Sequence, residues 1–419
     1  MTAPKLRFKE FDDNWLKVDI QSLVDEKIID KPMDGNHGEI HPTSADYVED
    51  GIPFVMATDV IDGKVHLGKS KKIKKSQADG LRKGFSLEGD ILLTHKATIG
   101  NVAKVPELET PYIMLTPQVT YYRVLNKDKL SQDFIKSTFE APIFQNALLA
   151  LCTGATRLYI GISEQRKLPF SYPSKKEQSK IASFLSTVDE KISQLTQKHQ
   201  LLSQYKQGMM QKLFSQQLRF KADDGSEFWE WVEKKIIDVA DYVDYRGKTP
   251  KKVENGVLLV TAKNIRFGYI DYEVSQEYIC SEDFDKVMRR GRAEIGDVLI
   301  TTEAPLGNVA SVDREGIALA QRVIKYRGKN GILNNEFLKQ KFLSEDFQAL
   351  ISSKATGGTV QGIKGSTLHN LEIHIPHDIE EQTKIANFLS SIDQKIEVVA
   401  QQIEQAKTWK KGLLQQMFV

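Results

Sequence analysis

The side chains of this chain best suited to bind a charged partner are basic residues gathered in short segments. Five lysines occupy seven consecutive positions at Lys69, Lys71, Lys72, Lys74 and Lys75, and Arg82 and Lys83 follow. Further groups are Arg246, Lys248, Lys251 and Lys252, and then Arg289, Arg290 and Arg292. Such clusters suit phosphate contacts, which position a nucleic-acid reader without conveying sequence. For any single cluster, a solvated charged surface is the alternative.

Polar residues in short loops could add base recognition. Lysine or arginine can bond guanine, asparagine or glutamine can bond adenine, and a carboxylate can accept from cytosine in the major groove. The candidate DNA contacts are Asn36, His37, Thr58, Lys71, Lys72, His95, Lys96, Thr98, Arg157, Arg246, Lys248, Lys263, Asn264, Arg266, Glu303 and Lys364.

Catalytic and metal-binding motifs are not recognisable in the sequence. The segment Gly357–Ile363 resembles a phosphate loop, but Ile363 stands where that loop needs a lysine. Glu233 and Lys235 lack a Pro-Asp partner, so a surface ion pair is the simpler interpretation. The histidines at 369, 374 and 377, and those at 37 and 41, lack the cysteine or His-Glu-x-x-His context of a zinc site. We therefore expect a non-catalytic chain with no metal and no directly bound cofactor.

The sequence elements that position these residues occur twice in the chain. The block Gly89-Asp90-Ile91-Leu92-Leu93-Thr94 with Gly100-Asn101-Val102-Ala103 returns 207 residues later as Gly296-Asp297-Val298-Leu299-Ile300-Thr301 with Gly307-Asn308-Val309-Ala310. Glu177-Gln178-x-Lys180-Ile181-Ala182 returns 204 residues later from Glu381. Two long collinear copies indicate a duplicated domain, because a solenoid has shorter and more numerous repeats. Within the shared blocks, His95-Lys96-Ala97-Thr98 is replaced by Thr302-Glu303-Ala304-Pro305, so the frame is kept while the loop chemistry changes.

Each copy ends in a long proline-free segment, from about Lys176 to Phe214 and from about Glu380 to Phe418, that is predicted to be a helix. Apolar residues recur in steps of four and three, which is typical of a coiled coil. The predicted interface residues are Ile181, Leu185, Val188, Ile192 and Leu195 in the first helix and Ile385, Leu389, Ile392, Ile396 and Val399 in the second. His199, Lys206 and Lys410 interrupt the series and are interpreted as polar positions that either fix the register or let aliphatic stems lie along the apolar surface. Two related helices pairing about a pseudo-two-fold axis must run antiparallel.

The rest of each copy predicts a mixed domain, with strands at Val257–Thr261, Val298–Thr302, Arg322–Tyr326 and Leu371–Ile375. The fold class is therefore α+β: domains 1–175 and 216–378, and helical spacers 176–215 and 379–419. The 58 basic and 56 acidic residues leave a net charge of only +2, so charge alone does not define a partner. Neither a signal peptide nor a membrane-length apolar run is evident, and Cys152 and Cys280 have no metal-site spacing, so a cytoplasmic protein with reduced thiols is expected.

Taken together, the motifs resemble the DNA-specificity subunit of type I restriction-modification systems over essentially the whole chain. The resemblance rests on Tyr245-Arg246-Gly247-Lys248-Thr249-Pro250, Asp34-Gly35-Asn36-His37-Gly38-Glu39, both Gly-Asp blocks, Thr356–Ile363 before a Leu-x-Ile-x-Ile-Pro strand, and both Glu-Gln-x-Lys-Ile-Ala helices. The first copy has no counterpart of Arg246, so a DNA-contact role for Arg246 would not carry over to that copy.

The resemblance implies two target-recognition domains that bind an asymmetric, bipartite double-stranded DNA target, with the helices setting the gap. It further implies two methyltransferase subunits that methylate adenine with S-adenosylmethionine, and two restriction subunits that use ATP and Mg. The alternative is a protein-interaction scaffold that does not bind DNA.

Overall fold

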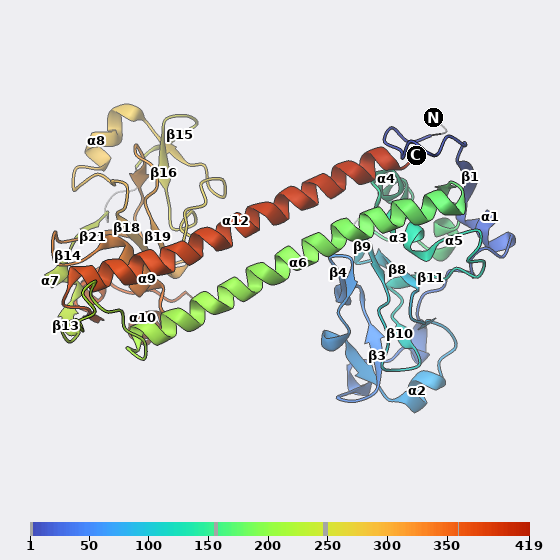
Figure 1. The fold of residues 1–419 in the computed structure, drawn as a ribbon, viewed down its shortest axis with the longest axis horizontal. Coiled ribbons are helices and arrows are strands. Elements are labelled where there is room, and N and C mark those ends of the chain that lie inside the picture. Colours follow the sequence, from blue (N-terminus) through green and yellow to red (C-terminus); the bar gives the residue numbers. More distant parts are fainter. Residues whose placement is uncertain (1–2, 155–157, 246–249, 359) are drawn as a thin grey trace. The chain divides into compact units, whose positions relative to one another are not determined.

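The computed structural model describes residues 3–154, 158–245, 250–358 and 360–419. The chain divides into two compact units: unit 1 comprises Met1–Thr196 with Gln401–Val419, and unit 2 comprises Gln197–Ala400. Both are mixed α+β, as the sequence predicts, and Figure 1 labels many of their elements. None of the helices in the described ranges combines the length and apolar character that crossing a bilayer requires.

The described residues of unit 1 form two larger sheets and two two-stranded sheets. The largest has the strand order β2-β6-β3-β10-β7, formed by Tyr47–Val48, Lys71–Ile73, Ile52–Val55, Ile113–Leu115 and Phe85–Ser86. A second has the order β11-β8-β9, formed by Val119–Tyr122, Ile91–Lys96 and Thr98–Lys104. The antiparallel pair β1 (Leu16–Asp19) and β12 (Pro169–Tyr172) and the short pair β4 (Val60–Ile61) and β5 (Lys64–Val65) complete the strands.

Short helices pack against the sheets of unit 1. They are α1 (Ile20–Asp25), α2 (Lys75–Asp79), α3 (Gln132–Glu140), α4 (Pro142–Ala150) and α5 (Ile162–Gln165), with short 3-10 turns such as η3 (Ala57–Asp59). α3 and α4 pack on β9 of the second sheet (Figure 1). Their phenylalanines join one core with residues of β8 and β12, whereas Ala78 of α2 packs in the core of the five-stranded sheet.

Unit 2 repeats this arrangement. Its sheets have the orders β14-β21-β18-β19, formed by Ala240–Asp244, Val323–Gly328, Val298–Thr302 and Leu306–Ser311, and β15-β17-β16-β20, formed by Lys252–Val253, Tyr278–Ile279, Val257–Val260 and Ala318–Leu319. A third sheet pairs β13 (Val232–Lys235) with β22 (Glu372–Ile375). The helices are α7 (Ile236–Val239), α8 (Phe284–Val287), α9 (Asn335–Leu343), α10 (Glu345–Lys354) and α11 (Gly365–His369).

The predicted strands of unit 2 are found with small changes at their ends. The strand expected at Arg322–Tyr326 begins at Val323, because Arg322 has a φ of 73° and so leaves the extended conformation. The strand expected to start at Leu371 starts at Glu372, and the one expected to end at Thr261 ends at Val260. Only Val298–Thr302 has the predicted bounds.

The long helices are α6 (Lys175–Phe214) and α12 (Ile379–Met417), each within one or two residues of the prediction. In unit 1, Ile181, Leu185 and Val188 are buried in a core that includes Leu413 and Met417. In unit 2, Ile385 and Leu389 share a core with Leu213. Of the other predicted interface positions, Leu195, Ile392 and Val399 are buried, and Ile192 and Ile396 are half-buried.

The two helices pair antiparallel, as predicted. In unit 1, Asp189 of α6 contacts Lys410 of α12, and in unit 2, Lys206 of α6 contacts Asp393 of α12. From Asp189 to Lys206, α6 advances by 17 residues, while the partner position on α12 moves back by 17 residues, from Lys410 to Asp393. The lysines that interrupt the apolar series are therefore ion-pair partners across the helix pair.

Candidate nucleic-acid interface

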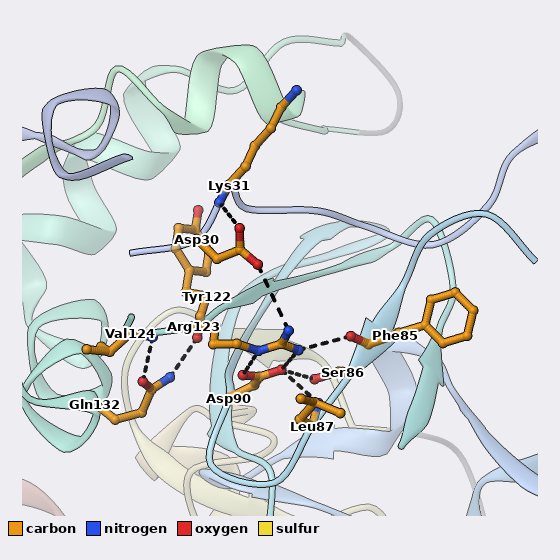
Figure 2. Close-up of polar contacts among 10 residues, drawn as sticks. All are labelled: Asp30, Lys31, Phe85, Ser86, Leu87, Asp90, Tyr122, Arg123, Val124 and Gln132. Atoms are coloured by element: carbon orange, nitrogen blue, oxygen red, sulfur yellow. Dashed lines mark hydrogen bonds and ion pairs between the residues drawn. The ribbon is translucent and has the colours of Figure 1, made fainter. Parts of the chain in front are cut away.

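The hairpin of β8 and β9 in unit 1 is anchored at its open end by the Asp90 carboxylate, which Figure 2 shows with its partners. Arg123 donates to it twice, from Nε to Oδ1 at 2.8 Å and from Nη2 to Oδ2 at 2.7 Å. Ser86 Oγ and the backbone N–H of Leu87 donate to the same carboxylate. The hydrogen bond with Asp90 raises the pKa of Arg123. Asp90 therefore joins β8 to the end of β11 and to the segment before β8.

Unit 2 repeats this anchor. Arg327 donates to Asp297 from Nε at 2.6 Å and from Nη2 at 2.9 Å, and Lys325 Nζ lies 3.1 Å away. Burial raises the pKa of Asp297, but the hydrogen bonds from Arg327 and from the Glu294 backbone, with the charge of Lys325, hold it below its ordinary value. The duplicated Gly-Asp blocks are therefore structural.

The duplicated Gly-Asn-Val-Ala blocks tie the second strand of each hairpin to a turn. Asn101 donates from its backbone to Thr94 Oγ1 at 2.9 Å and from Nδ2 to the Val60 carbonyl at 2.7 Å. In unit 2, Asn308 makes the same bonds to Thr301 Oγ1 at 2.9 Å and to the Ile265 carbonyl at 2.8 Å. The strand register shifts at this threonine in both hairpins.

A glutamine side chain from the neighbouring helix donates a hydrogen bond to the second strand of each hairpin. Gln145 Nε2 donates to the Gly100 carbonyl, and Gln348 Nε2 donates to the Gly307 carbonyl, both at 2.9 Å. Both glycines have positive φ, 89° and 79°, and a Cβ on Gly100 would lie 2.2 Å from Gln145. Glycine is required here by conformation and by close approach.

At the closed ends of the hairpins the frame is the same, but the side chains differ. β8 ends at Lys96, whose backbone bridges to Tyr159, and Ala97 has a φ of 69°. In unit 2, Glu303 bridges to Gly362, and Ala304 has a φ of 48°. We call Lys96–Thr98 and Glu303–Pro305 the hairpin tips.

A further segment meets each tip through the backbone. The His95 N–H donates to the Gln118 carbonyl, and the Thr302 N–H donates to the Arg322 carbonyl, both at 2.9 Å. Unit 1 thus has an exposed cation, Lys96, on its tip, whereas in unit 2 the Glu303 carboxylate on the tip lies 3.5 Å from the Arg322 guanidinium. Donors and acceptors of this kind can bond the edges of bases.

Two of the predicted contacts in unit 1 converge on a buried carboxylate, Asp34. His37 Nε2 lies 2.8 Å from Asp34 Oδ2, Lys83 also bonds this carboxylate, and His95 Nε2 lies 4.0 Å away. Burial raises the pKa of Asp34, but the bonds from Lys83 and His37 outweigh it, so the pKa lies below its ordinary value. His37 itself remains exposed.

Asn36 and His95 are buried, in contrast to the exposed loop positions expected for them. Asn36 accepts from the Arg82 N–H and donates to the Lys83 carbonyl. His95 belongs to β8, and its Nδ1 lies 2.9 Å from the Ile160 carbonyl. Their contacts make both residues supports for neighbouring segments, and base contact by either stays a prediction.

The other candidates of unit 1 lie on separate elements. Thr58 and Thr98 are exposed, in η3 and at the start of β9. Lys71 and Lys72 lie on β6, in a different sheet from His95, and Lys72 Nζ is 3.6 Å from Asp50. Arg157 lies outside the described residues.

In unit 2, Asn264 is fully buried and Lys263 beside it is exposed. Asn264 Oδ1 accepts from the Thr261 backbone, and its Nδ2 donates to the Asp271 carbonyl, so its amide builds the loop. Arg266 lies 3.7 Å from the Asp271 carboxylate. Lys364 is exposed before α11, while Arg246 and Lys248 lie outside the described residues.

The candidate DNA contacts chosen from the sequence did not include Asp34, Lys83 or Arg322, although Lys83 was placed in a basic cluster and Asp34 in a family motif. Arg322 could have been found by following the duplication, because it stands 204 residues after Gln118, beside a shared hairpin. Asp34 and Lys83 are brought together only by folding. The described residues contain no group of three or more His, Cys, Asp or Glu side chains placed to hold a metal ion.

Comparisons with known proteins match both copies. The family model "Type I restriction modification DNA specificity domain" matches residues 34–204 and 229–408. The type I restriction enzyme MjaVIII specificity subunit of Methanocaldococcus jannaschii is 27% identical, covering 92% of this chain and 86% of that protein. The putative MjaX specificity subunit of the same organism is 26% identical, covering 87% and 85%.

Solved structures show the same fold at low identity. The S subunit of a type I restriction-modification system from M. genitalium has a TM-score of 0.58 at 17% identity, covering 100% of this chain and 99% of that chain. A chain from a study of assembly and conformational transition of the type I R-M system has a TM-score of 0.52 at 16% identity, covering 96% of each.

Proposed function

This chain belongs to the type I restriction modification DNA specificity family, and we propose from that premise that it reads a bipartite, asymmetric DNA target. It is the specificity subunit of such a system, hence a recognition subunit and not a catalytic one. Each unit is proposed to contact one half-site of double-stranded DNA through its hairpin tip and the segments beside it. The paired helices are proposed to set the gap between the half-sites.

One observation carries this proposal: the two units share a hairpin frame and differ at its tip. Asp90 and Asp297 anchor equivalent hairpins, yet Lys96 in unit 1 corresponds to Glu303 in unit 2. A cation and a carboxylate prefer different base edges. Two equal half-sites would not need opposite charges at equivalent positions, so unlike half-sites are the better match.

A specificity subunit assembles with other subunits and with DNA. We propose two methyltransferase subunits and two restriction subunits as its protein partners. S-adenosylmethionine, ATP and Mg are assigned to those subunits, which would methylate adenine and translocate and cut DNA. Recognition of cellular and incoming DNA implies a cytoplasmic location for the assembly.

The decisive experiment replaces residues 1–175 with the corresponding residues of a relative that recognises another sequence. The chimera and the wild type are each assembled with the methyltransferase subunits, and methylated adenines are mapped by sequencing. We expect one half-site to change and the other to stay. A change in both half-sites would refute one half-site per unit.

A binding titration separates DNA reading from a purely protein-binding scaffold. With the methyltransferase subunits present, specific duplex should bind more tightly than random duplex, and log affinity should fall linearly with log salt. Absence of any DNA affinity in that complex would favour the scaffold.

A further inference from the structure

Arg322 has an unusual backbone conformation for its residue type. Its φ of 73° lies in the left-handed region, which a side chain with a Cβ occupies only at a cost. Its carbonyl accepts from Thr302 N–H at 2.9 Å, so the backbone is fixed beside the unit 2 hairpin tip. The side chain, by contrast, is 54% exposed. The backbone is therefore held in place while the guanidinium faces solvent.

The ion pair that Arg322 forms is too weak to offset the cost of its left-handed backbone. Its Nη2 lies 3.5 Å from Glu303 Oε1, and the Glu303 side chain is itself 42% exposed. An exposed ion pair contributes little to stability, and less than a left-handed non-glycine residue costs. Strain that stability does not explain is often found at functional sites.

Unit 1 has different chemistry at the same two places. Gln118 occupies the position of Arg322, since its carbonyl accepts from His95 N–H as that of Arg322 does from Thr302. Lys96 occupies the position of Glu303. The arginine-carboxylate pair is thus specific to unit 2, as expected for a group that reads one half-site only.

We propose that Arg322, oriented by Glu303, reads a guanine in the half-site of unit 2; this inference rests on the proposed DNA-reading function. The planar guanidinium has five N–H donors, so one edge can donate to guanine O6 and N7 while another faces the Glu303 carboxylate. The Glu303 carboxylate partly neutralises the guanidinium charge, so the attraction of Arg322 to DNA phosphates is weaker. The directional hydrogen bonds to the base are kept. Arg322 is a specificity-determining residue, and Glu303 is its positioning residue.

The test uses the full chain assembled with its methyltransferase subunits and compares wild type with Arg322→Gly. Glycine accepts the left-handed backbone, so this variant should melt at the same temperature as wild type or higher. We expect its affinity for the wild-type target to fall by roughly 10- to 100-fold, and one G·C pair of one half-site to become degenerate in the methylation map. Arg289→Gly, which removes an exposed arginine of a basic cluster, should leave the base preference unchanged.

A DNA probe checks the contacting atom. Replacing that guanine by 7-deazaguanine removes N7, and should weaken wild-type binding but not the binding of Arg322→Gly. Glu303→Gln should weaken the preference for guanine less than Arg322→Gly does, because Glu303→Gln removes only the charge that orients Arg322.

The inference is overturned if Arg322→Gly keeps full discrimination, if the half-site of unit 2 contains no required G·C pair, or if affinity falls equally for every sequence, which would make Arg322 a phosphate contact. A wild-type complex with no sequence preference would overturn the proposed DNA-reading function itself, and this inference with it.

Discussion

The Lys206 ammonium nitrogen of α6 lies 2.6 Å from Oδ1 of Asp393 on α12. The duplication repeats this relationship in unit 1, where Lys410 Nζ of α12 lies 2.7 Å from Oδ1 of Asp189 on α6. Each helix therefore contributes the lysine of one pair and the aspartate of the other. Burial raises the pKa of Asp189, but the charges of Lys136 and Lys410 outweigh it and lower the pKa overall. Ion pairs of this kind fix helix register, because a shift would leave a half-buried charge without its partner.

Breaking the Lys206–Asp393 pair should destabilise unit 2. Lys206→Met should lower the free energy of unfolding by about 1–2 kcal/mol, because the Lys206 side chain is 14% exposed and the Asp393 carboxylate would lose its ammonium partner. Denaturant titration measures this, with the exposed Lys395→Met as the matched control. In a double-mutant cycle, adding Asp393→Asn to Lys206→Met should cost less than Asp393→Asn does in the wild type. Additive effects would show that the pair contributes nothing.

Removing the anchor of the unit 2 hairpin should be more costly. Asp297→Ala leaves Lys325, which is 8% exposed, without its carboxylate and leaves Arg327 with only Glu294, for an expected loss of about 3–5 kcal/mol. Calorimetry should show the unfolding transition of unit 2 at a lower temperature. Glu282→Ala, at an exposed carboxylate of the same unit, is the control and should change little. An equal effect from both variants would contradict the structural role of the Gly-Asp block.

The stability of unit 1 should fall on mild acidification because of His95. Burial lowers the pKa of His95, and the hydrogen bond to the Ile160 carbonyl and the charge of Asp34 only partly offset this effect. The charges of His37 and Lys96 also disfavour the protonated ring. The unfolded chain, with a pKa of about 6.5, then binds the proton more readily. The stabilising contribution is therefore present above about pH 6.5 and lost as the pH falls through the lower folded-state pKa.

His95→Asn keeps a donor for the Ile160 carbonyl and removes the titrating group. Between about pH 8 and about pH 5, its melting temperature should fall less than that of the wild type, measured by calorimetry. His377→Asn, at an exposed histidine, should follow the wild-type slope. If the melting temperatures of wild type and His95→Asn change equally with pH, His95 is not the cause of the acid sensitivity.

Lengthening both helices should widen the gap in the DNA target. α6 and α12 each pass from one unit to the other, at Thr196–Gln197 and at Ala400–Gln401. Seven residues inserted at each point preserve the apolar phase and add about 10 Å, equivalent to roughly three base pairs. Methylation mapping should show the longer gap with both half-sites unchanged. Inserting the seven residues in an exposed loop instead should leave the gap unaltered. An unchanged gap in the helix variant would mean that helix length does not set it.

Much of the scaffold was predictable from the sequence. Comparing the two copies separates a shared frame from variable loops. In that frame Asp90 bonds Arg123, Asn101 bonds Thr94, and Gly100 adopts the positive φ that the hairpin needs. The apolar period identified α6 and α12 and the residues they bury, because helical periodicity alone decides which side chains share a face.

The candidate interface was less predictable. Charge and loop position selected His95, Asn36 and Asn264 as surface residues, whereas the fold buries them in hydrogen bonds with residues up to 65 positions away. A local pattern contains no information on which polar side chain a distant segment will cover.

By itself, the sequence determined the duplicated α+β architecture, the two long helices and the unlike chemistry of the two hairpin tips. Only the tertiary structure decided that Arg322 faces Glu303, that Asp34 gathers His37 and Lys83, and that Lys206 and Lys410 each find an aspartate on the opposite helix. The physical reason is range: periodicity and turn chemistry act over a few residues, whereas ion pairs and burial depend on segments that only the packed core brings together.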